Sequence, residues 1–207
     1  MKEWIKKGIV LVIAAALLGG AWQYRQQCMT EEIAGKIIRF HVRANSDTQA
    51  DQELKLKVRD AVGAYMQPRL SGISDVAASR RVVKENLPGI ERTASSVIAK
   101  EGYTYEVAAD LTVTDFPEKT YGDYTFPAGT YEALEVVIGE GRGHNWWCVM
   151  YPNLCFFNSV YQVVDEEAEE SLKKTLTPEE YKSLMEEKNY KVRFALAERI
   201  QEIFENL

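Results

Sequence analysis

Apolar and polar residues alternate in two stretches of the chain, and a period of two predicts β-strands. In residues 103–114 the odd-numbered positions are apolar and most even-numbered ones are polar. In residues 37–44 the even-numbered positions are apolar, while Arg39, His41 and Arg43 occupy the other face. Each strand is therefore expected to bury one face and to expose the other to water.

Two further strands are predicted around a glycine-rich segment. Residues 131–138 and 145–151 are rich in apolar, β-branched and aromatic residues, and residues 139–144 between them contain three glycines. Such a connection is typical of an antiparallel hairpin. It is not a phosphate-binding loop, because it leads into a strand and lacks the Gly-Lys-Ser/Thr sequence.

Helical spacing of apolar residues indicates helices between these strands. Residues 45–47 are of the types that cap helices, apolar residues follow at helical spacing, and Pro68 is expected to end this helix. A second helical region covers residues 75–101, and Pro88-Gly89 is expected to kink or split it.

The C-terminal part of the chain also predicts a helix. Thr177-Pro178-Glu179-Glu180 has the sequence of a capping box, and apolar residues continue on one side to Phe204. The acidic residues 165–170 are expected to be a solvated stretch. This order of elements predicts an α+β fold, a mainly antiparallel sheet with helices packed on one face.

The N-terminal segment predicts export or membrane anchoring. Residues 8–22 carry no charge and are almost all apolar, with lysines before them and Arg25 after them. A helix of this length spans roughly 22 Å, short of the roughly 30 Å hydrocarbon core, which favours a signal peptide. Tryptophans at both ends favour an anchor helix instead. The expected domains are residues 1–30, a signal peptide or membrane anchor, and residues 31–207, one extracytoplasmic domain.

The charge balance limits the partners of this domain. The chain has a net charge of −6, and because residues 1–30 contribute +3, the remaining body carries −9. An acidic body argues against nucleic acid, whose affinity comes mainly from Lys and Arg on phosphates. No motif indicates a cofactor, a resident metal or a small-molecule substrate.

Two cysteines flank a proline turn and allow several interpretations. Cys148 and Cys155 are seven residues apart in a body expected outside the cytosol, which favours a disulfide. Two buried thiols, a zinc site completed by His41 and His144, and a catalytic Cys148 with either histidine as base are the alternatives.

The basic face of the first strand also stays open between three interpretations. Arg39, His41 and Arg43 are unusual together in an acidic body. They fit a solvated face, internal pairing with carboxylates, or contact with a partner.

Two motifs carry a family resemblance. The run Gly-x-Gly-His-Asn-Trp-Trp-Cys-Val at residues 141–149, the second cysteine after a proline, and Arg-Phe-His-Val-Arg-Ala-Asn-Ser-Asp at residues 39–47 resemble the stage II sporulation protein R family. The resemblance implies a signalling protein, not an enzyme, that is exported from the forespore towards the space between forespore and mother cell. There it would activate a membrane-embedded aspartic protease, which processes the sigma factor E precursor.

The expected contact surface for that protease lies where the glycine-rich segment meets the basic face of the first strand. Its residues are the motif positions and two neighbouring arginines: His41, Arg43, Asn45, Asp47, Arg142, His144, Asn145 and Trp147. Two other classes of function remain open. One is an extracytoplasmic thiol-dependent hydrolase using Cys148 and His144, for which a fast-reacting free thiol would speak. The other is a structural envelope protein.

Overall fold

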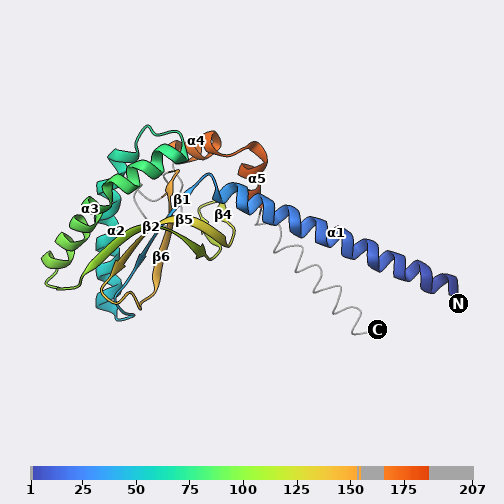
Figure 1. Ribbon diagram of the computed structural model, residues 1–207, viewed down its shortest axis with the longest axis horizontal. Coiled ribbons are helices and arrows are strands. Elements are labelled where there is room, and N and C mark those ends of the chain that lie inside the picture. The colour runs from blue at the N-terminus through green and yellow to red at the C-terminus, as the bar shows by residue number, and fades with distance from the viewer. Residues whose placement is uncertain (1, 153, 155–165, 187–207) are drawn as a thin grey trace.

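The computed structural model describes residues 2–152, 154 and 166–186. Two helices and a four-stranded sheet form the body, and a long N-terminal helix projects from it (Figure 1). The elements in chain order are α1 Lys2–Ala34, β1 Ile38–Arg43, α2 Gln49–Leu70, α3 Val76–Lys100, β2 Val107–Phe116, β3 Lys119–Tyr121, β4 Tyr124–Phe126, β5 Gly129–Ile138, β6 Asn145–Tyr151, α4 Glu166–Thr175 and α5 Pro178–Glu186.

The sheet is mixed, in contrast to the expected mainly antiparallel one. Its order is β2-β5-β1-β6, and β1 is parallel to β5 but antiparallel to β6. The predicted hairpin between β5 and β6 was wrong, because β1 lies between these two strands. The fold is α+β as predicted, with the first strand at the centre of the sheet.

Burial of β1 on both faces explains its central place. Phe40 and Val42 on one face have no exposed surface, and they belong to the core formed with α2 and α3. Arg39 and His41 on the other face are also buried, so the expectation of a half-buried strand was wrong. A strand without a solvent-facing side is stable inside a sheet and not at its edge.

The boundaries of α2 and α3 differ from the expected ones. Thr48 caps α2 by accepting a hydrogen bond from the Asp51 backbone at 3.3 Å, and the helix continues two residues beyond Pro68. Pro88 lies within α3, which runs unbroken from Val76 to Lys100. The Pro88 side chain is exposed, so the carbonyl group that lost its hydrogen bond is on the solvent side of the helix.

Three elements were not predicted. Strands β3 and β4 form a small antiparallel hairpin in a part of the chain for which the sequence indicated no element. From Glu166 onward the acidic stretch is the beginning of α4, where Glu166 and Glu170 are exposed while Ala168 and Leu172 of the same helix are buried. Ion pairs four residues apart, Glu169 with Lys173 and Glu170 with Lys174, stabilise the exposed side of this helix.

Helix α1 is continuous from the apolar segment into the body. Ile33 near its C-terminal end is buried in the core, whereas Ile13, Leu17 and Leu18 are exposed. The core of the body therefore includes the C-terminal end of α1. Among the described helices, none is both long and apolar enough to cross a membrane.

Glu180 joins α5 to the segment before β1. It accepts hydrogen bonds from Lys36 Nζ at 2.6 and 2.7 Å and from the Thr177 backbone N–H at 2.7 Å, while its own N–H donates to Thr177 Oγ1. The predicted capping box is thus confirmed. Burial by itself raises the pKa of Glu180, but the hydrogen bonds from Lys36 and Thr177 outweigh it and lower this pKa.

We expect Glu180→Gln to lower the free energy of unfolding by about 2 kcal/mol at pH 7, because charged hydrogen bonds at a buried group are lost. A lowered carboxyl pKa stabilises the fold above the pKa of the unfolded state and ceases to do so as pH falls through the folded-state pKa. The difference from wild type should therefore shrink in acid, as urea denaturation between pH 7 and pH 3 would show. The control is Glu179→Gln, because Glu179 pairs with Arg25 in solvent and should change stability by under about 0.5 kcal/mol.

Candidate functional site

Asn45 connects the loop after β1 to the glycine-rich loop, residues 139–144. Its side-chain oxygen accepts from the Glu140 N–H at 3.0 Å, its amide donates to Asp51 at 2.9 Å, and its backbone carbonyl accepts from the Arg142 N–H at 3.1 Å. The neighbouring Ala44 carbonyl accepts from the Gly143 N–H at 2.9 Å. We call these contacts between residues 44–52 and 139–144 the clasp.

Gly139 allows the glycine-rich loop to approach Asn45. Its φ of +57° is in the left-handed region, and a Cβ atom there would lie 2.4 Å from the Asn45 side-chain oxygen. Both the backbone angle and the space thus require glycine. The sequence predicted a hairpin loop here, whereas the structure shows a loop that is hydrogen-bonded to the residues after β1.

Asp47 and His144 form an exposed pair on top of the clasp. The His144 backbone N–H donates to Asp47 Oδ1 at 2.6 Å, and the His144 ring Nδ1 contacts the same oxygen. These contacts, the backbone one first, lower the pKa of Asp47. The His144 side chain is nevertheless 80% exposed, so its other ring nitrogen is available to a partner.

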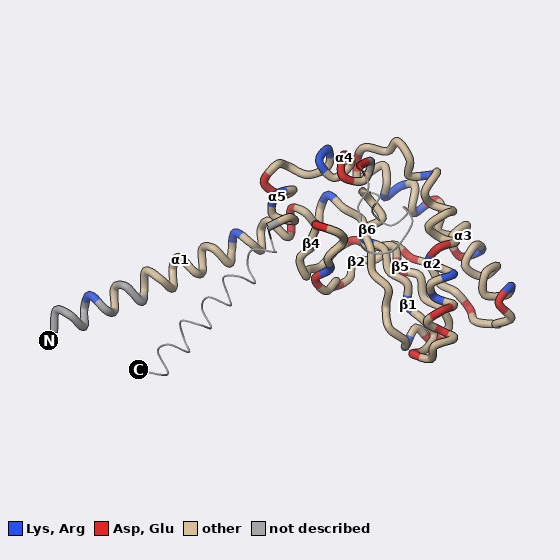
Figure 2. Tube along the Cα trace, turned by 180° about the vertical axis from the view of Figure 1, so that it is seen from behind, with Lys and Arg blue, Asp and Glu red and all other residues tan. Residues whose placement is uncertain are grey.

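Lys55 of α2 contacts the backbone of His144. Its ammonium group donates to the His144 carbonyl at 2.9 Å and to Gln52 at 2.5 Å, and burial lowers its pKa. Arg142 pairs with Glu140 at 3.1 Å beside His144, and both side chains are exposed. Acidic and basic residues lie close together at this end of the body (Figure 2). We call the exposed side chains of Asp47, Glu140, Arg142 and His144 the loop surface.

His41 lies apart from the loop surface, on the sheet face that α2 and α3 do not cover. Only 2% of it is exposed, and its ring stacks on that of Trp147 with 5.0 Å between centroids. Burial lowers the pKa of His41 to about 4, although the nearby Glu135 carboxylate acts in the opposite direction. His41 is therefore neutral at pH 7, and its 3.7 Å contact with Glu135 is not an ion pair there.

Arg39 occupies the same sheet face under the β3–β4 hairpin. The guanidinium lies 4.6 to 5.9 Å from the ring centroids of Phe116, Tyr121, Phe126 and Tyr131. It also donates to the Cys148 carbonyl at 3.1 Å and to the Tyr121 hydroxyl at 3.3 Å. Burial lowers its pKa, while the two tyrosines have the opposite effect. Arg39 thus holds the hairpin on the sheet and belongs to the interior.

Six of the eight expected contact residues form two groups. Asn45, Asp47, Arg142 and His144 come together at the clasp. His41 and Trp147 pack together on the sheet face, and Arg43 contacts Glu135 at 3.4 Å between the groups. Asn145 is opposite Arg43 and half-buried.

Sequence reasoning missed Lys55 and Glu135. The sequence did contain a signal for Lys55, because this lysine follows the apolar Leu54 and lies on the side of α2 that is buried.

The positions of the side chains argue against the zinc site and the catalytic Cys148. Residues paired across strands point to the same face, and Cys148 pairs with Phe40 while Trp147 pairs with His41. Cys148 and His41 are therefore on opposite faces of the sheet. His144 precedes Cys148 by four residues, or roughly 13 Å of extended chain, and is exposed where Cys148 is buried.

No catalytic or zinc-binding arrangement of these side chains follows. Within residues 2–152, 154 and 166–186, no group of three or more His, Cys, Asp or Glu side chains could hold a metal ion. Cys155 lies outside the described residues, so the disulfide with Cys148 stays a prediction.

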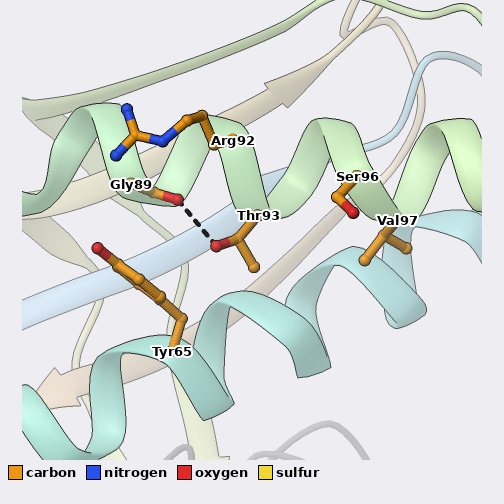
Figure 3. Close-up of a pocket in the computed structure, with 6 residues that line it drawn as sticks. All are labelled: Tyr65, Gly89, Arg92, Thr93, Ser96 and Val97. Atoms are coloured by element: carbon orange, nitrogen blue, oxygen red, sulfur yellow. Dashed lines mark hydrogen bonds between the residues drawn. The ribbon is translucent and has the colours of Figure 1, made fainter.

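A surface pocket of about 400 Å³ lies between α2 and α3. Tyr65 of α2 points towards Gly89 of α3, and the Thr93 hydroxyl donates to the Gly89 carbonyl at 2.8 Å (Figure 3). A Cβ atom at Gly89 would lie 1.9 Å from the Tyr65 hydroxyl, so this glycine makes room for the tyrosine. The remaining lining residues are Arg92, Ser96 and Val97. The pocket contains none of the eight expected contact residues.

Known proteins resemble this chain over most of its length. A family model described as stage II sporulation protein R matches residues 34–162. A protein of Bacillus subtilis (strain 168) with the name stage II sporulation protein R is 35% identical over 213 aligned residues, which cover 95% of each chain. No solved structure matches the chain. The family match includes all six strands and both sides of the clasp.

Proposed function

The chain belongs to the stage II sporulation protein R family, and from this premise we propose that it is an intercellular signal of endospore formation. It is exported from the forespore by its N-terminal segment and activates a membrane-embedded aspartic protease of the mother cell. That protease then processes the sigma factor E precursor. The chain itself performs no catalysis in this proposal.

The loop surface is the observation that supports a binding role best. Asp47, Glu140, Arg142 and His144 are exposed and charged or polar, yet backbone hydrogen bonds of the clasp fix the loop that carries three of them. A surface fixed before binding loses little conformational entropy when it meets a partner. The separation of Cys148 from both histidines agrees with a role in binding.

His41 and Trp147 pack together on the sheet, apart from this surface. The buried His41 ring packs against Phe116 and Trp147, and Trp147 is only half-buried. Alanine at His41 should therefore act mainly through stability. We place the protease contact at the loop surface and not on the His41 face.

The test is co-expression of the full chain with the protease and the sigma factor E precursor in a host that does not form spores. Arg142→Ala and His144→Ala are expected to reduce precursor processing by about tenfold or more, the effect of a lost central contact. Their thermal stability should match wild type, because the Arg142 and His144 side chains are exposed and pair with exposed carboxylates.

Arg81→Ala is the matched control, since it removes another exposed arginine, in α3 on a different part of the body. It should process the precursor normally. Wild-type processing by stable Arg142→Ala and His144→Ala proteins would place the contact elsewhere. No processing with the wild-type chain would refute the proposed function itself.

A further inference from the structure

Strand β2 is an edge of the described sheet, and it is regular along its whole length. Its ten residues pair with β5 from Val107 to Phe116 without a register shift. Proteins normally interrupt such an edge with bulges, prolines or lysines, because its unpaired N–H and C=O groups can pair with another strand. Strand β2 contains no proline and no basic residue.

Two hydrogen bonds show which backbone groups point away from the sheet. The Glu106 carbonyl accepts from Gly139 next to β5, so even-numbered residues direct their groups inward. The Ala109 N–H donates instead to the Glu91 side chain of α3 at 3.0 Å. Since the direction alternates along an antiparallel pair, Leu111, Val113 and Asp115 also direct their backbone groups outward.

The two halves of this edge differ. Glu91 covers the first half at Ala109, and the Leu111 N–H donates to its neighbour Asp110 at 2.7 Å. The second half carries Val113, a β-branched apolar side chain that is 72% exposed. The structure thus leaves residues 111–115 open to pairing.

We propose that β2 pairs antiparallel with β2 of a second copy of this chain, about a two-fold axis at Val113. The sheet would then continue through both copies. Val113 would face Val113 of the second copy, which removes two exposed apolar side chains from water. This dimer is independent of the proposed signalling function.

The sequence of β2 is complementary to itself in this register. Leu111 lies opposite Asp115 and Thr112 opposite Thr114, so no carboxylate faces another, and threonine pairs are favourable across strands. Pro117, which has no N–H, lies opposite Ala109, whose N–H Glu91 already occupies. The hydrogen bonds between the two β2 strands would therefore end, in both directions, at the last residues that have a free N–H group.

The outward N–H groups of Val113 and Asp115 need no rearrangement to pair. Only the Leu111 N–H must first leave Asp110. An interface of this kind is isologous and closes at two copies, which argues against a growing fibre.

Cysteine cross-linking of the full chain in detergent micelles tests the register. In a Cys28→Ser background, which removes the free Cys28, Val113→Cys should form a covalent dimer under mild oxidation. Directly opposed residues in hydrogen-bonded pairs have Cα atoms about 5.5 Å apart, within the range of a disulfide.

Ala108→Cys is the matched control on the same strand. Position 108 is exposed, but its counterpart in the two-fold register is residue 118, which lies about 33 Å along the strand from position 108 of the second copy. The Ala108→Cys chain should therefore not cross-link. Equal cross-linking of both variants, or none for Val113→Cys, overturns the proposal.

Sedimentation without oxidant gives a second measurement. The Cys28→Ser chain should be dimeric, and Val113→Lys should raise its dissociation constant by about tenfold or more, because two like charges would meet at the axis. The melting temperature of Val113→Lys should be unchanged, since the side chain is exposed in the monomer. A monomeric Cys28→Ser chain would contradict the proposal, even if another molecule binds to this edge of the sheet.

Discussion

Replacing Arg39 with alanine is expected to lower the free energy of unfolding by about 3–5 kcal/mol. The substitution removes a fully buried side chain from between four aromatic rings and leaves a cavity under the β3–β4 hairpin. It also leaves the buried Cys148 carbonyl without the donor Nε. Urea denaturation followed by tryptophan fluorescence would measure this loss.

Arg39→Met separates packing from charge at this position. Methionine fills a similar volume and avoids the desolvation of a guanidinium that lowers the Arg39 pKa, but it gives up the cation–π contacts. We expect a loss of about 1–2 kcal/mol, well below that of alanine. Equal losses for both variants would show that the charge, and not the packing, stabilises the hairpin. A loss under about 1 kcal/mol for alanine would contradict the expected role of Arg39.

Replacing Gly143 with alanine is expected to cost about 2–3 kcal/mol of stability and to reduce precursor processing. A Cβ atom at this position would lie 2.2 Å from the Ser46 carbonyl oxygen, a backbone atom that cannot rotate away. The loops must separate, which breaks the hydrogen bond from the Gly143 N–H to the Ala44 carbonyl. Thermal melts and the co-expression measurement would report the two effects.

Gly35→Ala is the control for the Gly143 substitution. A Cβ atom at Gly35 meets only the Glu31 and Glu32 carbonyls at 3.6 Å, an ordinary contact distance, and its backbone angle is not positive. Its stability should stay within about 0.5 kcal/mol of wild type. If Gly143→Ala were as stable as wild type, the two loops of the clasp would be packed less tightly than their contacts indicate. If it were destabilised and still processed normally, the loop surface would not be the protease contact.

The capping box at α5 shows what could be predicted locally. Thr177 and Glu180 are three residues apart, and both hydrogen bonds between them form within one turn. The ion pair of Glu180 with Lys36 could not be predicted, because 144 residues separate the partners in sequence.

The candidate site was predictable only in part. The sequence placed the glycine-rich segment against the basic face of the first strand, whereas the segment contacts Ala44 and Asn45, which follow that strand. It also grouped His41 with the loop, although the alternation along β1 directs that ring to the sheet face beside Trp147. Which positions meet at a strand end depends on the neighbouring strand, and the neighbour of β5 proved to be β1 and not β6.

The sequence by itself determined the family, through the motifs around residues 39–47 and 141–149, and the approximate positions of the main strands and helices. These follow from neighbouring residues, whose periodicity and capping act over one or two turns. Only the tertiary structure decided the strand order, the parallel pairing of β1 with β5 and the burial of Arg39. Arg39 occupies a polar position of an alternating strand, which predicts exposure to water. It is buried because a distant aromatic hairpin folds over it, and four rings with two hydrogen bonds replace its hydration.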